Sequence, residues 1–211
     1  MNVAVCFSGQ ARAVNNLIDR FNTHLLQPYK PDIFAFFWSG YEEILFLDKF
    51  RPVSCIVTPQ KNLFKDKEWE RRGNTPSMTY AIREANKLKK DRESLYKFTY
   101  DVVVRVRTDL SIIGTPPLDI TAPNKIFVTK DRYCNGSVSD QFAFGDSLSM
   151  DKYSLSYDFM LENETNMCGE AVIYSNAVAN GLSFELIPNF EHELLVLDKY
   201  LRGKKYWWEE I

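Results

Sequence analysis

Residues 100–110, with the sequence YDVVVRVRTDL, decide the fold class, because they read as a buried strand that ends in charged residues. Side chains alternate between the two faces of a strand, so the valines at even-numbered positions are expected on one face. Three charged side chains are expected in a row on the other face, about 7 Å from one to the next. They are Arg105, Arg107 and Asp109.

This charged row would lie at the C-terminal end of the strand, where open α/β sheets bind their ligands. A guanidinium group binds phosphate bidentately. A carboxylate beside it suits a divalent cation, which prefers hard oxygen ligands. The pattern therefore predicts a site for a metal-bound diphosphate. A structural network of arginine and aspartate at the end of the strand is the alternative, since such networks also occur away from active sites.

Short apolar runs elsewhere predict further buried strands, and segments with helical spacing of apolar residues predict the helices between them. Strands are expected at residues 3–7, 33–38, 53–57, 101–107, 125–128, 141–144 and 183–187. Helices are expected at residues 14–25, 75–98, 147–159, 170–180 and 191–201. This order predicts an α/β fold with a central, mostly parallel mixed sheet of about six strands flanked by helices, in a single domain over residues 1–211.

The composition limits the classes of function. The chain has 211 residues, of which 45% are hydrophobic, and its formal net charge of -2 argues against a nucleic-acid partner. It contains neither an apolar run long enough for a membrane span nor a signal-peptide pattern, so an intracellular, soluble protein is expected. The four cysteines show no CxxC spacing, and neither a zinc ribbon nor a thioredoxin motif is predicted.

Residues 7–12, with the sequence FSGQAR, follow the first strand and form a second candidate site. Gly9 lets backbone amides approach a ligand, and the N-terminus of the following helix favours anions. Arg12 is expected in the first turn of that helix, where the helix dipole opposes its charge, so an anionic partner is expected. A plain tight turn is the alternative. No GxGxxG or Walker A pattern is present, so a generic dinucleotide or P-loop site is not supported.

Three candidates lie in the second half of the chain. Asp140 precedes the strand at 141–144, where it could act as a general base or as a turn or cap residue. Glu170 begins a helix and could line an acceptor pocket or cap that helix. His192 could complete a metal site or be an ordinary surface histidine.

Three motifs together resemble those of nucleotide-sugar-dependent glycosyltransferases with the GT-A fold. They are an apolar strand followed by Ser-Gly-x-x-Arg at 8–12, Tyr-Asp-x-Val-Val-Arg-x-Arg-x-Asp-Leu at 100–110, and Ser-Asp-x-Phe-Ala-Phe-Gly at 139–145. The resemblance covers most of the chain, and the Arg-x-Arg-x-Asp-Leu element is its most specific part. It implies a GT-A-like fold, a nucleotide-diphosphate sugar donor that is commonly UDP-linked, a glycan acceptor and a divalent metal such as Mn²⁺.

The resemblance also implies roles for individual residues on the donor side. Asp109 matches the last aspartate of the family's Asp-x-Asp motif, which binds the metal, whereas Arg107 stands where the first aspartate would be. This departure leaves a thin set of metal ligands, which His192 or a water molecule would complete. Arg105 and Arg107 would neutralise phosphate charge or fix Asp109. The nucleotide would be held by four residues after the first strand: Phe7, Ser8, Gly9 and Arg12.

On the acceptor side, the resemblance makes Asp140 the base that deprotonates an acceptor hydroxyl in an inverting reaction, with Glu170 as the next candidate. The family includes glycosyltransferases with which algal viruses build capsid glycans, so the host-cell cytoplasm and further domains of a longer polypeptide are expected. A nucleotide- or glycan-binding module without turnover is the alternative function. A nucleotidyltransferase is a third, but it would normally show a glycine-rich phosphate loop that residues 8–10 do not provide.

Overall fold

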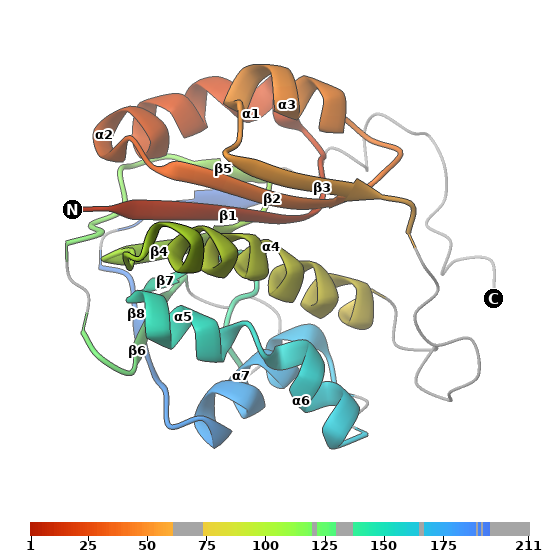
Figure 1. The fold of residues 1–211 in the computed structure, drawn as a ribbon, viewed down its shortest axis with the longest axis vertical. Helices are drawn as coiled ribbons and strands as arrows, with labels where there is room; N and C mark the ends of the chain where they lie inside the picture. The colour runs from red at the N-terminus through yellow and green to blue at the C-terminus, as the bar shows by residue number, and fades with distance from the viewer. Residues whose placement is uncertain are drawn as a thin grey trace.

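The computed structural model of the chain describes residues 1–60, 74–119, 122–129, 137–164, 167–188, 190 and 192–194. In this part of the chain, helices cover both faces of a central seven-stranded sheet (Figure 1). The strands, in order across the sheet, are β3 Ser54–Thr58, β2 Asp32–Trp38, β1 Val3–Gln10, β4 Val102–Val106, β7 Phe142–Gly145, β6 Lys125–Val128 and β8 Ser183–Leu186. The predicted α/β fold with a mixed sheet between helices is confirmed, with seven strands in place of about six.

Within the described main sheet, β7 alone runs against the other strands. Strands β3, β2, β1 and β4 run parallel to one another. Strand β7 is antiparallel to both β4 and β6, and β6 is parallel to β8. The C-terminal ends of four parallel strands therefore share one edge of the sheet with the N-terminal end of β7. A second sheet pairs β5 Leu110–Ile112 with β9 His192–Leu194 in antiparallel register.

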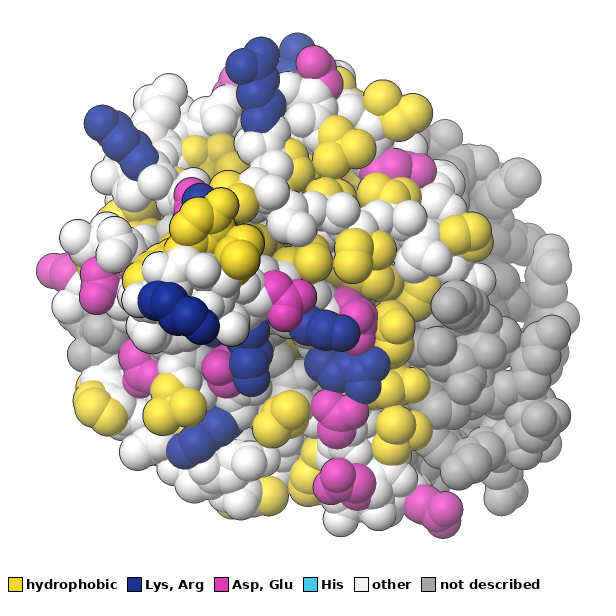
Figure 2. Space-filling view, viewed as in Figure 1, with side chains coloured by type: hydrophobic (Ala, Val, Ile, Leu, Met, Phe, Trp, Pro, Cys, Tyr) yellow, Lys and Arg dark blue, Asp and Glu magenta, His cyan; other side chains and the backbone are white. Residues whose placement is uncertain are grey.

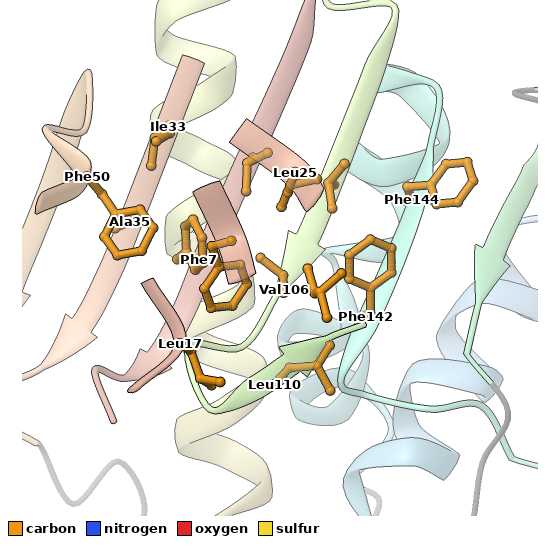
Figure 3. Packing of buried hydrophobic residues seen from close by; sticks show 14 of the residues in the cluster. Phe7, Leu17, Leu25, Ile33, Ala35, Phe50, Val106, Leu110, Phe142 and Phe144 are labelled. Carbon is orange, nitrogen blue, oxygen red and sulfur yellow. The ribbon is translucent and has the colours of Figure 1, made fainter. Parts of the chain in front are cut away.

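Two groups of helices cover the two faces of the sheet, as Figure 1 shows. On the first face lie α1 Val14–Phe21, α2 Gln27–Tyr29 and α3 Glu43–Phe50; on the second lie α4 Thr75–Tyr96, α5 Ser147–Tyr153, α6 Ser156–Glu162 and α7 Gly169–Ala179. The core of the first face is aromatic: Phe7 of β1 lies 5.0 and 5.5 Å from the rings of Phe46 and Phe50 of α3, between centroids (Figure 3). Such edge-on and tilted pairs add stability beyond the burial of their area.

The expected alternation of side chains in β4 is confirmed. The even-numbered valines belong to the core of the first face, together with Phe7 and Leu17. Val103 belongs to the core of the second face, together with Ala81 and Ile82 of α4. Because side chains two residues apart share a face of a strand, Arg105 lies on the α4 side of the sheet.

A buried ionic network joins α4 to α5 and to the start of β4. The Lys89 side chain is fully buried, and its Nζ donates hydrogen bonds to Glu93 Oε2 at 2.9 Å, Ser147 Oγ at 2.6 Å and Asp151 Oδ1 at 2.8 Å. Glu93 Oε1 accepts a further bond from the backbone N of Tyr100 at 2.9 Å. The network satisfies the buried charge of Lys89, which would otherwise be costly to place there.

Several expected elements differ from the structure. The helix expected at 14–25 consists of α1, a π-helical turn over Asn22–Leu26 and then α2. The helix expected at 147–159 is two helices. Asn176 Nδ2 donates hydrogen bonds to the carbonyl oxygens of Lys152 and Tyr153, at 2.9 and 3.1 Å, and a continuous helix would need these oxygens as acceptors for its own backbone N–H groups. Helix α3 was not expected.

The helix expected at 191–201 is wrong for residues 192–194, which form β9 because their backbone pairs with β5; residues 195–201 lie outside the described part of the chain. Residues 137–140, which lead into β7, form neither helix nor strand. Among the described residues, no helix is long and apolar enough to cross a membrane. Figure 2 shows positive and negative side chains interspersed on the face that carries α4.

Candidate functional site

A cavity of about 150 Å³ lies where β1, β2 and β4 end and α4 begins. It brings together six of the residues that the sequence singled out: Ser8, Gly9, Arg12, Arg105, Arg107 and Asp109. They come from two segments about 100 positions apart, which meet because β1 and β4 are parallel neighbours, with Cys6 opposite Arg105 and Phe7 opposite Val106. The cavity therefore lies where open α/β sheets bind ligands.

The glycine of the β1 segment is required by its backbone. Gly9 has φ +113°, a conformation that other residues rarely adopt, and open space surrounds the position of a Cβ atom there. Phe7 does not line the cavity: its side chain is fully buried in the core of the first face, so its predicted contact with a nucleotide is wrong for the side chain. The alternation of β1 places Ser8 on the opposite face, next to the cavity.

Arg12 lies before the helix and not in its first turn. Helix α1 begins at Val14, and Ala13 precedes it in a left-handed conformation with φ 56°. The helix-dipole argument for Arg12 therefore does not apply. Its backbone N donates to the carbonyl oxygen of Gln10 and to Thr108 Oγ1, both at 2.9 Å, and its guanidinium carbon lies 5.3 Å from the centroid of the Tyr41 ring.

Thr108 connects the two segments that line the cavity. Besides accepting the bond from Arg12 N, its hydroxyl donates to the carbonyl oxygen of Gln10 at 2.9 Å. Thr108 is only 2% exposed, so both bonds are shielded from water. Sequence reasoning missed this residue, although it lies inside the charged motif between Arg107 and Asp109.

Arg105 is a buried cation that lines the cavity. The residue is 2% exposed, and its Nε and Nη1 atoms have no hydrogen-bond partner among the residues that the structure describes. Burial lowers the pKa of the Arg105 guanidinium, against the opposing effect of nearby groups such as Tyr153 and Asp140. A buried charge without a partner is costly, and an anion in the cavity would supply the missing acceptor.

Arg107 and Asp109 form a bidentate ion pair in place of the extended row that the strand pattern predicts. Strand β4 ends at Val106, and the chain turns so that Arg107 Nε and Nη2 each donate to one Asp109 oxygen at 2.8 Å. Burial raises the pKa of the Asp109 carboxyl, but the Arg107 charge and hydrogen bonds outweigh it, and the pKa is lowered. For this pair, the structure matches the alternative interpretation of the sequence, a structural network of arginine and aspartate at the end of the strand.

Asp140 joins this group from the segment that leads into β7, the antiparallel strand of the sheet. Because β7 is antiparallel, the residues that precede it lie at the edge where β1 and β4 end. Arg107 Nη1 lies 3.5 Å from Asp140 Oδ2, and Asp140 is 7% exposed. Asp140 is not among the described residues that line the cavity, whereas its partner Arg107 is.

Glu170 is not among the described residues that line the cavity. Glu170 lies in the first turn of α7. That helix begins close to the start of α4: a Cβ atom on Gly169 would lie 2.4 Å from the Cε atom of Met78, which lines the cavity. His192 belongs to β9, where its backbone pairs with Ile112, three residues beyond Asp109.

The described residues offer a divalent cation one carboxylate in the cavity wall. They contain no group of three or more histidine, cysteine, aspartate or glutamate side chains that could hold a metal ion. Cations of the Mg²⁺ and Mn²⁺ type, however, often bind through one or two carboxylates and the phosphates of their ligand. Asp109 could hold such a cation if Arg107 gives up one of its bonds to the carboxylate or shares an oxygen with the cation.

Further cavity residues come from positions that sequence reasoning missed. Gln60 Nε2 donates to Ser77 Oγ at 3.3 Å, and Trp38 Nε1 donates to the carbonyl oxygen of Ser77 at 3.1 Å. Gln10 Nε2 lies 3.5 Å from Gln60 Oε1. Position in the sequence could have indicated them, since Trp38 is the last residue of one expected strand and Gln60 lies just beyond the end of another.

Comparison with known proteins leaves the chain without an assigned family: no protein-family model matches its sequence, and no curated protein matches it either.

We expect Thr108→Val to lower the free energy of unfolding by about 1–3 kcal/mol, because it removes the two hydrogen bonds of the Thr108 hydroxyl, to Arg12 N and to the Gln10 carbonyl. Thr108→Ser keeps the hydroxyl and should retain most of the stability. Urea denaturation of the two variants and the parent measures the difference. Equal stability of all three would show that the hydroxyl does not connect the segments.

We expect Arg105→Met to raise the free energy of unfolding by about 1 kcal/mol or more, because it removes a buried charge without a partner. The same variant should bind inorganic pyrophosphate at least about tenfold more weakly in isothermal titration calorimetry.

Arg83→Met is the matched control, because Arg83 pairs with Asp158 at 2.7 Å and with Glu84 at 2.9 Å. It should lower stability and leave pyrophosphate binding unchanged. Arg105→Met with parental pyrophosphate affinity would exclude Arg105 as the anion receptor.

Proposed function

We propose that this chain is a GT-A-like glycosyltransferase that moves a sugar from a nucleotide-diphosphate donor, UDP-linked, to a hydroxyl of a glycan acceptor. The observation that carries the proposal is the buried guanidinium of Arg105, which lines the cavity and whose Nε and Nη1 atoms have no hydrogen-bond partner among the described residues. An anion with several oxygens matches this requirement, and a diphosphate provides them.

The donor side of the proposed site is built from β1 and β4. Ser8 and Gly9 border the cavity where a backbone can approach a ligand closely, and Arg105 would bind the diphosphate. Arg12 belongs to the same cavity wall and adds positive charge. A divalent cation such as Mn²⁺, held by Asp109 and the diphosphate, would help to neutralise the charge of the leaving group.

On the acceptor side, Asp140 is the proposed base. As the acceptor oxygen bonds to the anomeric carbon and the bond from that carbon to the diphosphate breaks, the Asp140 carboxylate would take the hydroxyl proton. Its position beside Arg107 keeps it close to the diphosphate site. Glu170, at the start of α7, is the next candidate.

A binding module without turnover is the second candidate, and one observation favours it. The Asp140 carboxylate faces Arg107 and does not line the cavity with the other described residues, so the proposed base has no direct access to a bound ligand in this conformation. Turnover therefore requires a rearrangement of Arg107 or of the chain that carries Asp140, whereas nucleotide binding at Arg105 does not.

A thermal-shift panel of UDP, GDP, CMP and ADP, each with and without manganese, tests the proposed function. A ligand that binds only the folded chain stabilises it by about 2.7 kcal/mol at a hundredfold excess over its Kd. We expect stabilisation by UDP with manganese. Release of UDP from UDP-sugars then distinguishes an enzyme from a binding module. Failure of all four nucleotides to raise the melting temperature would contradict the proposal.

We expect Asp140→Asn to lower the rate of sugar transfer by about 10²–10⁴-fold, because the amide cannot accept the hydroxyl proton. Binding of UDP should stay close to that of the parent, since the amide oxygen can still face Arg107. Initial rates with a UDP-sugar and calorimetry with UDP separate the two effects. Near-parental rates would transfer the role of base to Glu170, and loss of UDP binding would place Asp140 in the donor site.

A further inference from the structure

We propose that Arg107 gates the metal position: it withholds Asp109 from free divalent cations and releases it only when a diphosphate replaces the carboxylate as its partner. Metal and nucleotide would then bind as a pair. The inference rests on the proposed function, because it assigns the diphosphate of the nucleotide donor as the competing partner of Arg107.

The ion pair occupies both oxygens of the only carboxylate that lines the cavity within the described part of the chain. Arg107 Nε bonds to Asp109 Oδ1 and Arg107 Nη2 to Asp109 Oδ2, each at 2.8 Å. The Asp109 side chain is 11% exposed. A cation that binds Asp109 must therefore displace one of these charge-assisted bonds or share an oxygen with the positively charged guanidinium, and both are unfavourable in a site largely shielded from water.

Arg107 is able to exchange this partner. Its side chain is 28% exposed and lines the cavity, so a ligand can reach the guanidinium. The planar fork that matches a carboxylate matches a phosphate equally well. Its Nη1 already lies 3.5 Å from Asp140 Oδ2, so Asp140 would remain as a carboxylate partner of the guanidinium after Asp109 has bound the cation.

Charge balance favours joint binding. Arg105 and Arg107 contribute two positive charges, and Asp109 and Asp140 contribute two negative charges, so these four side chains sum to zero. A divalent cation alone would add two positive charges to a shielded site that also borders Arg12. A diphosphate that carries the cation brings compensating negative charge, and it also gives Arg105 the acceptor that it lacks.

The arrangement differs from a pair of metal-binding aspartates. With a carboxylate at position 107, two acidic groups would attract a free cation. With Arg107 in that position, the same segment repels a free cation and attracts a phosphate. The gate thus explains why a cation ligand and a guanidinium stand two residues apart in one motif.

The experiment is a titration of the metal-free chain with Mn²⁺, in which electron paramagnetic resonance measures unbound Mn²⁺. The parent should bind Mn²⁺ about ten- to hundredfold more tightly with saturating UDP than without it. Arg107→Gln should bind Mn²⁺ alone more tightly than the parent by a similar factor. The double variant Arg107→Gln with Asp109→Asn should lose this gain. Arg83→Gln, on the surface of α4, is the matched control and should behave as the parent.

Two results would overturn the gate: equal Mn²⁺ affinity of the parent with and without UDP, or no gain of Mn²⁺ affinity in a folded Arg107→Gln. The first needs no variant, so it decides the matter even if Arg107→Gln does not fold. Failure of the proposed function looks different, because UDP would then not bind in either condition. Inorganic pyrophosphate replaces UDP in that case, and an unchanged Mn²⁺ affinity in its presence would again overturn the gate.

Discussion

The position of β4 in the middle of the main sheet is the constraint on which the candidate site depends. Backbone pairing with β1 on one side and β7 on the other holds the strand along its length. Helices cover both of its faces, so β4 residues are removed from water whatever their chemistry. An arginine placed in such a strand loses its hydration. The cavity at the end of β4 is the place where a ligand can make up for that loss.

Two arginines separated by a single residue differ in their hydrogen bonding because the strand ends between them. Arg105 is still in β4 and has unbonded N–H groups, whereas Arg107 lies in the turn and reaches Asp109. From the usual rise of a strand, a buried guanidinium that lacks hydrogen-bond partners and one that is fully paired therefore lie within about 10 Å of each other. Local departures from full hydrogen bonding tend to mark functional positions, and Arg105 is such a departure.

The sequence predicts the strands well because a period of two is visible locally and valine-rich runs belong to central strands. It does not predict the contact between Arg107 and Asp109, because the periodic argument assumes that the strand continues. It also places Arg12 in the first turn of the following helix, whereas the left-handed conformation of Ala13 separates Arg12 from that helix. Strand β9 depends on pairing with β5, some 80 positions away, and no local pattern reports such a partner. The meeting of Ser77 with Trp38 is equally non-local.

The reversal of direction at β7 has an evolutionary consequence. Strand β7 runs against both of its neighbours, so the residues that precede it lie where β1 and β4 end, and the cavity wall and Asp140 belong to segments that are far apart in the chain. Mutations in the segment that enters β7 alter what stands beside the cavity without changing the β1–β4 pairing that shapes it. A lineage that carries this fold can therefore diversify one half of its site while selection keeps the other half constant.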